Sequence, residues 1–582
     1  MNGGRWMPWA VVLAAAAAGS WGLTWGLPGR ERLLQLMPAE RADDPVLHRS
    51  LAEGRTELYR SLEAAGRLPV DYITEAVRIP GGWTTPPERL RNSYRSYFLR
   101  TAHPDEQKTL TYLAHMKPRR LDFEPYGVDY GGGYVYPLGA VYGVLGALRI
   151  VRVSSDLTVY LADVSLMARV FLAGRILNVL CFALCGLLLF RFARRSWGAA
   201  AGAAAAFFFL SSPVVSVVTH TLNPYGWATA WCLLAFGWFK DHLDGDGDGP
   251  ASRAALRKGA AAIGACIGCS FAFIPVGALL LAPLFASGAG RKRGEKLFLA
   301  AEAAAVAGAV FVALNPYLFL RFEKFTGQLV FLATAFPYSL TPRAFAGFIG
   351  RFLMPNWGVL QTVAGLAGVA YLLVSAGRSR MDRLLGAVFC LAFLNMGGRM
   401  EDLSHGRHFL PFFAIGSAAA AGLLWERTAG RRRPLAWVLS AAVFLDAAAV
   451  SASYLRNYAQ EAAGRSTRSE ASRWIAGNVP AGSSVGLLQP PQYSETPPFR
   501  FDRHELVLFG APEQLQDLPL PDFVVANEAF VQGRFAPFFA SRYEAAAAFR
   551  PRRLFPWIPV RGVFTMSNLE FVVLRRRPEA AK

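Results

Sequence analysis

The chain has 582 residues, of which 53% are hydrophobic and only 18% are charged, and its mean hydropathy is +0.27. Soluble proteins carry about a quarter of their residues as charged ones. Here the apolar residues also form runs of about 20 residues, the length that a membrane-spanning helix needs. The composition therefore excludes an ordinary soluble protein and predicts an integral membrane protein.

The formal net charge of +20 does not indicate a nucleic-acid partner. The basic residues cluster beside apolar runs, which is typical of short cytoplasmic loops and suits anionic lipid headgroups. These clusters are Arg291-Lys292-Arg293, Arg378 with Arg380 and Arg383, and Arg431-Arg432-Arg433. We therefore expect membrane lipid as a partner and no nucleic acid.

The first apolar run, within 1–27, follows Arg5 and is long for a cleaved signal peptide, so we expect an uncleaved first transmembrane helix. A large polar loop, 28–133, follows it. The segment 134–454 then forms a multi-span membrane domain. Its apolar runs lie near 134–150, 168–190, 198–219, 222–240, 258–287, 296–316, 357–376, 383–397, 407–425 and 435–454. This gives eleven spans. A hairpin in the run that contains Pro275 would raise the count, and we expect about 11–13 spans.

The basic loops predict the orientation. With the N-terminus in the cytoplasm, loops 288–296, 376–383 and 426–434 are cytoplasmic, and both 28–133 and 455–582 lie outside. Arg191, Arg194 and Arg195 disagree, because this count puts them outside as well.

The tail, 455–582, has the pattern of a small soluble α/β domain. A helix is expected at 469–477, and short buried strands at 484–488, 505–509, 522–526 and 569–574, separated by proline and glycine turns. The predicted fold class is thus mainly α: a polytopic helical bundle with a large first external loop and a C-terminal α/β domain.

Within the first polar loop, His103-Pro104-Asp105-Glu106 is the main candidate for chemistry. Proline followed by two acids is a common start of a helix, and Leu110, Leu113 and Met116 continue at a spacing of three. A capped helix at the membrane surface explains these residues fully. A carboxylate there could also deprotonate an acceptor hydroxyl.

Two further polar groups are predicted on the same outer side. Asp129, Tyr130 and Tyr136 flank a run of three glycines, and such tyrosines either anchor the chain at the membrane interface or stack on a sugar. Arg407 and His408 belong to a cluster between two spans and could bind a phosphate, or could belong to a solvated loop with its own ion pairs.

No metal site is predicted. The acidic repeat at 244–249 imitates an EF-hand loop, but Ala255 stands where the bidentate acid should be. Cys266 and Cys269 lie in an apolar helix without a second pair, as buried small residues do.

Taken together, the sequence resembles the membrane glycosyltransferases of the GT-C superfamily. It is most similar to bacterial relatives of the dolichyl-phosphate-mannose protein mannosyltransferases and of the lipid A aminoarabinose transferase. The resemblance rests on Asp105-Glu106 in the first external loop, Tyr130-Gly131-Gly132 and Tyr136-Pro137 before the second span, Gly174-Arg175 in the third, Arg407 to Pro411 late in the chain, and an α/β tail containing Asp522 to Val525.

This resemblance implies transfer of a sugar from a polyprenyl-phosphate carrier, on the external face of a bacterial inner membrane. It implies Asp105 as the base, with inversion, and Glu106 in support. Arg407, His408 and Arg175 would bind the donor phosphate, and His103 would lie with Asp129, Tyr130 and Tyr136 along the substrate. The family includes metal-using and metal-free members, and it leaves the sugar and the acceptor (protein, lipid or glycan) undetermined.

Two departures from the family pattern stand out. Asn223 occupies the position where relatives often have a second acid, and the first loop carries about seventy extra residues before the acidic pair. Two alternatives stay open: a transporter or flippase of envelope glycan precursors, and a non-catalytic envelope-assembly protein.

Overall fold

A computed structural model gives the structure of the chain. It describes residues 6–54, 75–79, 83–125, 127, 130–245, 249–285, 292–323, 325–327, 330, 338–375, 378–398, 403–428, 433–509, 519–533, 535–552, 554–555 and 566–578.

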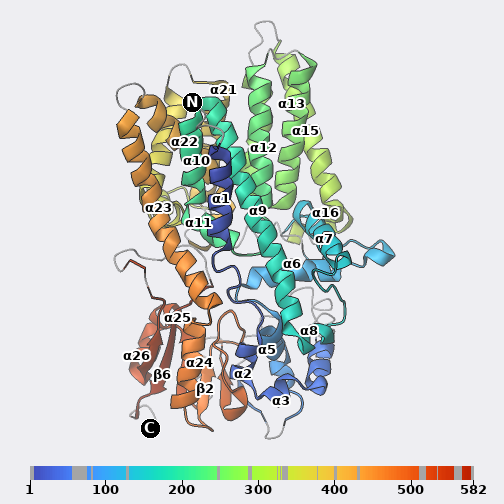
Figure 1. Cartoon of the computed structure of the whole chain (residues 1–582), viewed down its shortest axis with the longest axis vertical. Coiled ribbons are helices and arrows are strands. Elements are labelled where there is room, and N and C mark those ends of the chain that lie inside the picture. The colour runs from blue at the N-terminus through green and yellow to red at the C-terminus, as the bar shows by residue number, and fades with distance from the viewer. Residues whose placement is uncertain are drawn as a thin grey trace.

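The helical bundle occupies one end of the molecule and runs along its long axis (Figure 1). Its helices are α1 (Met7–Ser20), α9 (Val164–Trp197), α10 (Ala199–Leu210), α11 (Pro213–Thr219), α12 (Tyr225–Asp244), α13 (Pro250–Cys269), α15 (Arg293–Leu314), α20 (Val359–Val374), α21 (Arg380–Gly397), α22 (Leu410–Arg427) and α23 (Arg433–Ala462). The mainly helical membrane fold predicted from the sequence is thereby confirmed.

Among the described residues, four helices are long and apolar enough to cross a membrane: Val164–Trp197, Arg293–Leu314, His405–Arg427 and Arg433–Ala462. Two bent pairs pass the same test together, α10 with α11 at 65°, and Pro342–Trp357 with α20 at 113°. The run 258–287 breaks at Ser270, between α13 and the 3-10 helix η3 (Phe271–Leu281), which contains Pro275. The first run is helical only over Met7–Ser20.

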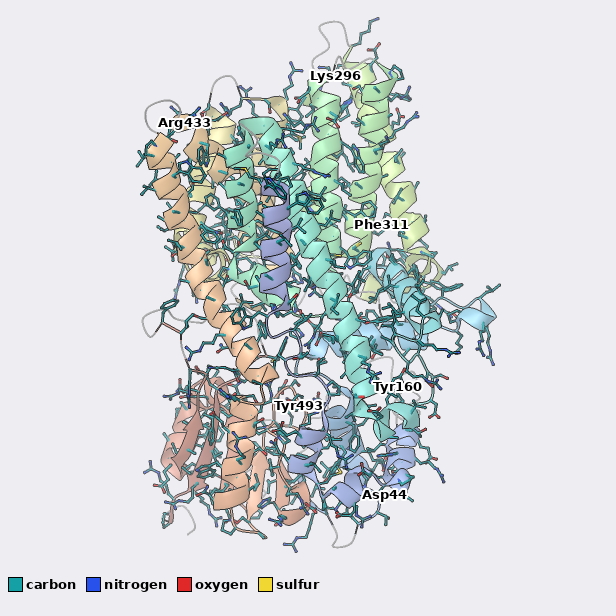
Figure 2. The ribbon with its side chains drawn as sticks, viewed as in Figure 1. Asp44, Tyr160, Lys296, Phe311, Arg433 and Tyr493 are labelled. Carbon is teal, nitrogen blue, oxygen red and sulfur yellow. The ribbon has the colours of Figure 1, made fainter. Side chains whose placement is uncertain are left out.

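The disagreement over Arg191, Arg194 and Arg195 disappears in the structure. The run at 134–150 forms α7 (Gly132–Ala147), whose 16 residues are too few to cross a bilayer. Arg195, near the end of α9, pairs with Asp241, near the end of α12. These ends lie at the end of the molecule where Lys296 and Arg433 also lie, opposite Asp44 and Tyr493 (Figures 1 and 2). If α7 is not counted as a crossing, the sequence count also puts these arginines on the same side as the other basic loops.

Shorter helices connect the bundle to the rest of the molecule. They are α2 (Arg30–Leu36), α3 (Ala39–Ala42), α5 (Glu88–Leu99), α6 (Pro104–His115), η2 (Pro118–Arg120), α8 (Thr158–Ala162), α14 (Ala282–Phe285), α16 (Pro316–Leu320), α18 (Pro342–Gly347), η4 (Phe348–Leu353), α19 (Met354–Trp357) and η5 (Leu403–Phe409). In Figure 1, α6 and α7 lie between the bundle and the opposite end of the molecule.

A mixed sheet forms the other end of the molecule, in the strand order β1-β3-β2-β4-β6-β5. Its strands are β1 (Glu75–Arg78), β2 (Ser484–Leu487), β3 (Glu505–Leu508), β4 (Phe523–Asn527), β5 (Tyr543–Phe549) and β6 (Phe571–Arg576). The helices of the tail are α24 (Thr467–Asn478), η7 (Phe501–Arg503), α25 (Glu528–Gln532) and α26 (Ala536–Arg542).

The predicted α/β tail is confirmed, with two additions. Strand β2 is parallel to β3 and β4, whereas β6 is antiparallel to both β4 and β5. Strand β5 is alanine-rich and lacks the β-branched signal of a buried strand, so the sequence did not reveal it. The edge strand β1 comes from the first polar loop and pairs antiparallel with β3. The two polar segments therefore fold as one unit.

Arg468 ties this unit to the last helix of the bundle. Its side chain is 1% exposed and pairs with Glu461, near the end of α23, at 2.9 Å between Nη1 and Oε1. Its Nη2 donates to the carbonyl oxygens of Ser494 and Met566, each at 2.7 Å. Because a buried guanidinium needs such partners, these bonds join α23 and α24 to the segments that lead into β3 and β6.

Candidate functional site

The acidic pair lies at the start of α6, as the sequence predicted for a helix beginning at Pro104. His103 is the N-cap residue, and its Nδ1 accepts a hydrogen bond from the backbone N–H of Asp105 at 3.3 Å. Pro104 occupies the first helical position, where its missing N–H costs no hydrogen bond. Successive residues of a helix point about 100° apart, so Asp105 and Glu106 face different surroundings.

Asp105 faces the segment that leads into α22. Its Oδ2 lies 2.5 Å from Nη1 of Arg407, and the side chains of Asp105 and Arg407 are 21% and 19% exposed. Burial raises the pKa of Asp105, but the charges of Arg407, His103 and Lys108 outweigh it and hold that pKa below its usual range. At neutral pH the site therefore presents a partly exposed, ionised carboxylate.

Glu106 faces the interior and is fully enclosed. Its Oε1 accepts from Nε of Arg175 at 2.8 Å and from the backbone N–H of Leu222 at 2.9 Å. Its Oε2 accepts from Nη2 of Arg175 and from the hydroxyl of Thr101, both at 2.6 Å. Burial raises the pKa of Glu106, yet the bonds with Arg175 outweigh it and lower that pKa. Each of its two carboxylate oxygens thus accepts two hydrogen bonds.

Arg175, on α9, is equally enclosed. Besides its two bonds to Glu106, its Nη1 donates to the carbonyl oxygens of Leu23 and Trp25, each at 2.7 Å. Both side chains of the ion pair are 0% exposed. The structure therefore brings Arg175 to the acidic pair but leaves it no surface with which to meet the phosphate suggested by the sequence resemblance.

An aromatic group surrounds Arg407. Its guanidinium carbon lies 5.6 Å from the ring centre of Tyr225, at the start of α12. The hydroxyl of Tyr225 lies 3.0 Å from Nε2 of His408, and its ring lies 6.2 Å from that of Tyr130. Lys108 Nζ lies 5.3 Å from the ring centre of Tyr130. Arg407, His408 and Tyr130 thus meet near Asp105, whereas Asp129 falls outside the described residues.

Sequence reasoning missed Tyr225 and Lys108. Tyr225 directly follows Asn223-Pro224, a sequence that marks a helix start, and this position at the head of a span was the available signal. Lys108 is one helical turn after Pro104 on the predicted helix, so it could have been placed near Asp105.

The glycines after Tyr130 allow two elements to approach closely. A Cβ atom on Gly131 would lie 1.9 Å from the carbonyl oxygen of Gly268 at the end of α13. The backbone N–H of Gly132 donates to Oδ1 of Asn315 at 2.8 Å. Side chains are excluded by this packing, so these glycines hold α7 against α13 and do not form a ligand loop.

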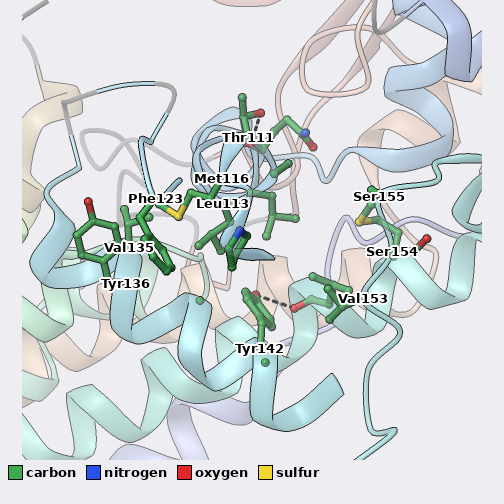
Figure 3. A pocket seen from close by; sticks show the side chains of 18 of the residues that line it. Thr111, Leu113, Met116, Phe123, Val135, Tyr136, Tyr142, Val153, Ser154 and Ser155 are labelled. Carbon is green, nitrogen blue, oxygen red and sulfur yellow. Dashed lines mark hydrogen bonds between the residues drawn. The ribbon is translucent and has the colours of Figure 1, made fainter. Parts of the chain in front are cut away.

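A cavity of about 1140 Å³ lies on the opposite side of α6 from Asp105. It is lined largely by apolar side chains of α6 and α7, such as Leu113, Val135 and Tyr142, which Figure 3 shows around the space. Tyr136 also lines it. Polar lining residues, including Arg100 and Ser155, interrupt the apolar wall. The cavity has the volume and the lining of a site for a large apolar group.

The hydrogen bonds of Asn223 explain why this position holds an asparagine and not an aspartate. Its Nδ2 lies 2.8 Å from the carbonyl oxygens of Val218 and Thr221, and its Oδ1 accepts from the N–H of Tyr225 at 3.0 Å. Aspartate has no side-chain donor and would meet these carbonyl oxygens with negative charge. The amide therefore suits the turn between α11 and α12.

Within the described part of the chain, no three His, Cys, Asp or Glu side chains lie close enough together to hold a metal ion. All six cysteines are free.

No family model and no curated protein matches the sequence. Solved structures give distant likenesses. ArnT from Cupriavidus metallidurans bound to undecaprenyl phosphate is 14% identical, with 97% of each chain covered and a TM-score of 0.42. The apo state of the same protein is 14% identical over 81% of this chain and 93% of that one, with a TM-score of 0.41. The oligosaccharyltransferase AglB from Archaeoglobus fulgidus, with an inhibitory peptide and a dolichol-phosphate, is 12% identical over 96% and 75%, with a TM-score of 0.39. Likenesses at this level assign no activity to the chain.

Proposed function

We propose that this chain is an integral membrane glycosyltransferase that moves a sugar from a polyprenyl-phosphate-linked donor to an acceptor on the external face. Asp105 is the base and Arg407 binds the donor phosphate. The N-terminus lies in the cytoplasm of a bacterium, and the sheet-containing end lies outside. The grouping of Arg195, Lys296 and Arg433 at the other end supports this orientation.

One observation carries the proposal: α6 bears chemistry of two kinds on two sides. On one side, Asp105 pairs with Arg407 while both stay partly exposed. On the other side, Leu110 and Leu113 line the large apolar cavity. A polyprenyl-phosphate donor needs an apolar space for its chain and a guanidinium for its phosphate, and arginine binds phosphate with paired hydrogen bonds.

The proposed reaction is a single displacement. The oxygen of an acceptor hydroxyl attacks the anomeric carbon of the sugar, and the hydroxyl proton passes to Asp105. The bond between the anomeric carbon and the phosphate oxygen breaks, and the polyprenyl phosphate leaves with the bonding electrons beside Arg407. Attack opposite to the leaving group inverts the anomeric centre.

The other predicted residues then take distinct roles. Glu106 and Arg175 are positioning residues, because their mutual bonds fix the start of α6 against α9. His103 caps that helix. His408 orients Tyr225 beside the guanidinium, and we keep Tyr130 as a surface for the sugar.

The test compares the native strain with one that carries Asp105→Asn, by mass spectrometry of envelope glycans, lipids and proteins. A glycan product should disappear from the variant while the protein still reaches the membrane. Asp43→Asn is the matched control, because Asp43 also pairs with an arginine, Arg30, but at an exposed position. Its products should be unchanged.

Full product formation by Asp105→Asn would contradict the assignment of the base. A transporter or flippase predicts another result: purified protein in vesicles would move a lipid-linked sugar between leaflets without cleaving it. Measuring release of polyprenyl phosphate in the same vesicles separates these activities.

A further inference from the structure

We propose that the Asp105–Arg407 pair is a latch that the donor opens: its phosphate takes the guanidinium, and Asp105 becomes a free base only when a donor is bound. This inference rests on the proposed function and adds an order of events to it. In this scheme, binding of the donor phosphate to Arg407 makes Asp105 able to accept a proton.

The first support is the geometry of the pair. One nitrogen of Arg407 meets one oxygen of Asp105, and the two residues are 302 positions apart in the chain, on α6 and η5. About a fifth of each side chain is exposed. Glu106 and Arg175, by contrast, are fully enclosed and joined by two parallel bonds. Of these two pairs, the pair of Asp105 is therefore the more open one.

The second support is the balance of charge. The charged and titratable groups that act on Asp105 are Arg407, His103 and Lys108. The phenols of Tyr130 and Tyr225 and the imidazole of His408 also lie here, whereas residues 399–402, which precede η5, fall outside the described residues. Among the described residues, the cations Arg407 and Lys108 both act on Asp105, so an arriving phosphate meets positive charge here.

When phosphate replaces Asp105 as the partner of Arg407, Arg407 gains a better acceptor and Asp105 becomes a stronger base. A phosphate offers Arg407 two acceptor oxygens in the fork geometry that guanidinium prefers, whereas Asp105 engages it through a single contact. An aspartate that has lost its cation binds a proton more tightly, which makes it a better base. Without a donor, the base stays neutralised by Arg407.

The latch makes an unusual prediction about binding. Because Asp105 competes with phosphate for Arg407, Asp105→Asn should bind a polyprenyl phosphate more tightly than the native protein does, by about tenfold. The probe is undecaprenyl phosphate, titrated against the full-length protein in nanodiscs. Arg407→Gln should bind the same probe at least tenfold more weakly.

Three controls sharpen the experiment. Undecaprenol, which lacks the phosphate, should bind Asp105→Asn and the native protein equally. Asp43→Asn, which opens an exposed pair with Arg30, should leave the affinity for undecaprenyl phosphate unchanged. Asp105→Ala removes the carboxylate by another route and should reproduce the gain if Asp105→Asn is poorly folded.

Equal or weaker binding of undecaprenyl phosphate by both Asp105 variants would overturn the latch. The proposed function fails separately. A native protein that transfers sugar, with no gain in affinity in the variants, keeps the function and loses the latch. A gain in affinity in a protein that transfers no sugar keeps the latch and loses the function.

Discussion

Asp105 and Glu106 are adjacent in the chain, and each pairs with an arginine, yet the two pairs have opposite designs. The Glu106–Arg175 pair is 0% exposed, and both oxygens of the carboxylate are occupied twice. The Asp105–Arg407 pair is a single contact with about a fifth of each side chain exposed. A closed pair holds a structure in place, whereas an open pair can exchange partners. The helix start therefore combines an anchor and a reactive group in two consecutive residues.

The largest expected effect tests the closed pair. Glu106→Gln leaves Arg175 buried without a counter-charge, so the free energy of unfolding should fall by about 3–5 kcal/mol. Denaturant titration of the protein in detergent measures this loss. Adding Arg175→Met should restore part of it, because the uncompensated charge is removed. If Glu106→Gln is as stable as the native protein, the pair is not an anchor.

The next prediction concerns Asn223, which is buried like the Glu106–Arg175 pair. Asn223→Asp replaces a buried donor with a charge that faces the carbonyl oxygens of Val218 and Thr221. A loss of about 1–3 kcal/mol in the free energy of unfolding is expected, with no gain in sugar transfer. Asn478→Asp is the matched control, since Asn478 makes a similar bond to Trp474 at an exposed position. Higher transfer activity in Asn223→Asp would instead identify a missing catalytic acid.

The open pair should matter little for folding. Asp105→Asn is expected to change the free energy of unfolding by no more than about 1 kcal/mol, because partly exposed ion pairs contribute little. The same denaturant titration measures it beside Glu106→Gln. A loss equal to that of Glu106→Gln would erase the distinction between the two pairs.

The smallest effect concerns pH. Burial lowers the pKa of His103 below its ordinary value of 6.5. Below pH 6.5 the unfolded chain therefore binds a proton that the folded protein does not, and stability falls as the pH drops toward the folded-state pKa. His103→Asn keeps an N-cap side chain but cannot titrate, so its midpoint temperature should fall less between pH 6.5 and 5. An unchanged slope would show that other groups govern this pH range.

Local signals predicted much of the fold. The start of α6 at Pro104 follows from proline and acids in the first turn, and strands β2, β3, β4 and β6 follow from short apolar runs between turns. The composition of α7 suggested a span, whereas the structure gives it a helix of 16 residues between the bundle and the opposite end of the molecule.

The partners of the acidic pair could not be predicted. Arg175 lies 69 positions from Glu106, and Arg407 lies 302 from Asp105. Arg175 was identified as a candidate by resemblance and Arg407 also from its polar cluster, and both were assigned to the donor phosphate. The two arginines differ in the exposure of their side chains, which depends on how the helices pack in the folded protein. The amino-acid sequence alone does not give that exposure.

The pairing of β1 with β3 has a consequence for synthesis in the cell. Strand β1 (Glu75–Arg78) leaves the ribosome before the main bundle, and β3 (Glu505–Leu508) follows its last helix. At about 5–20 residues per second, the edge strand waits on the order of tens of seconds for its partner. During that interval its backbone groups are an unpaired template for other chains. Completion of the sheet thus has to follow the synthesis of every helix between the two strands.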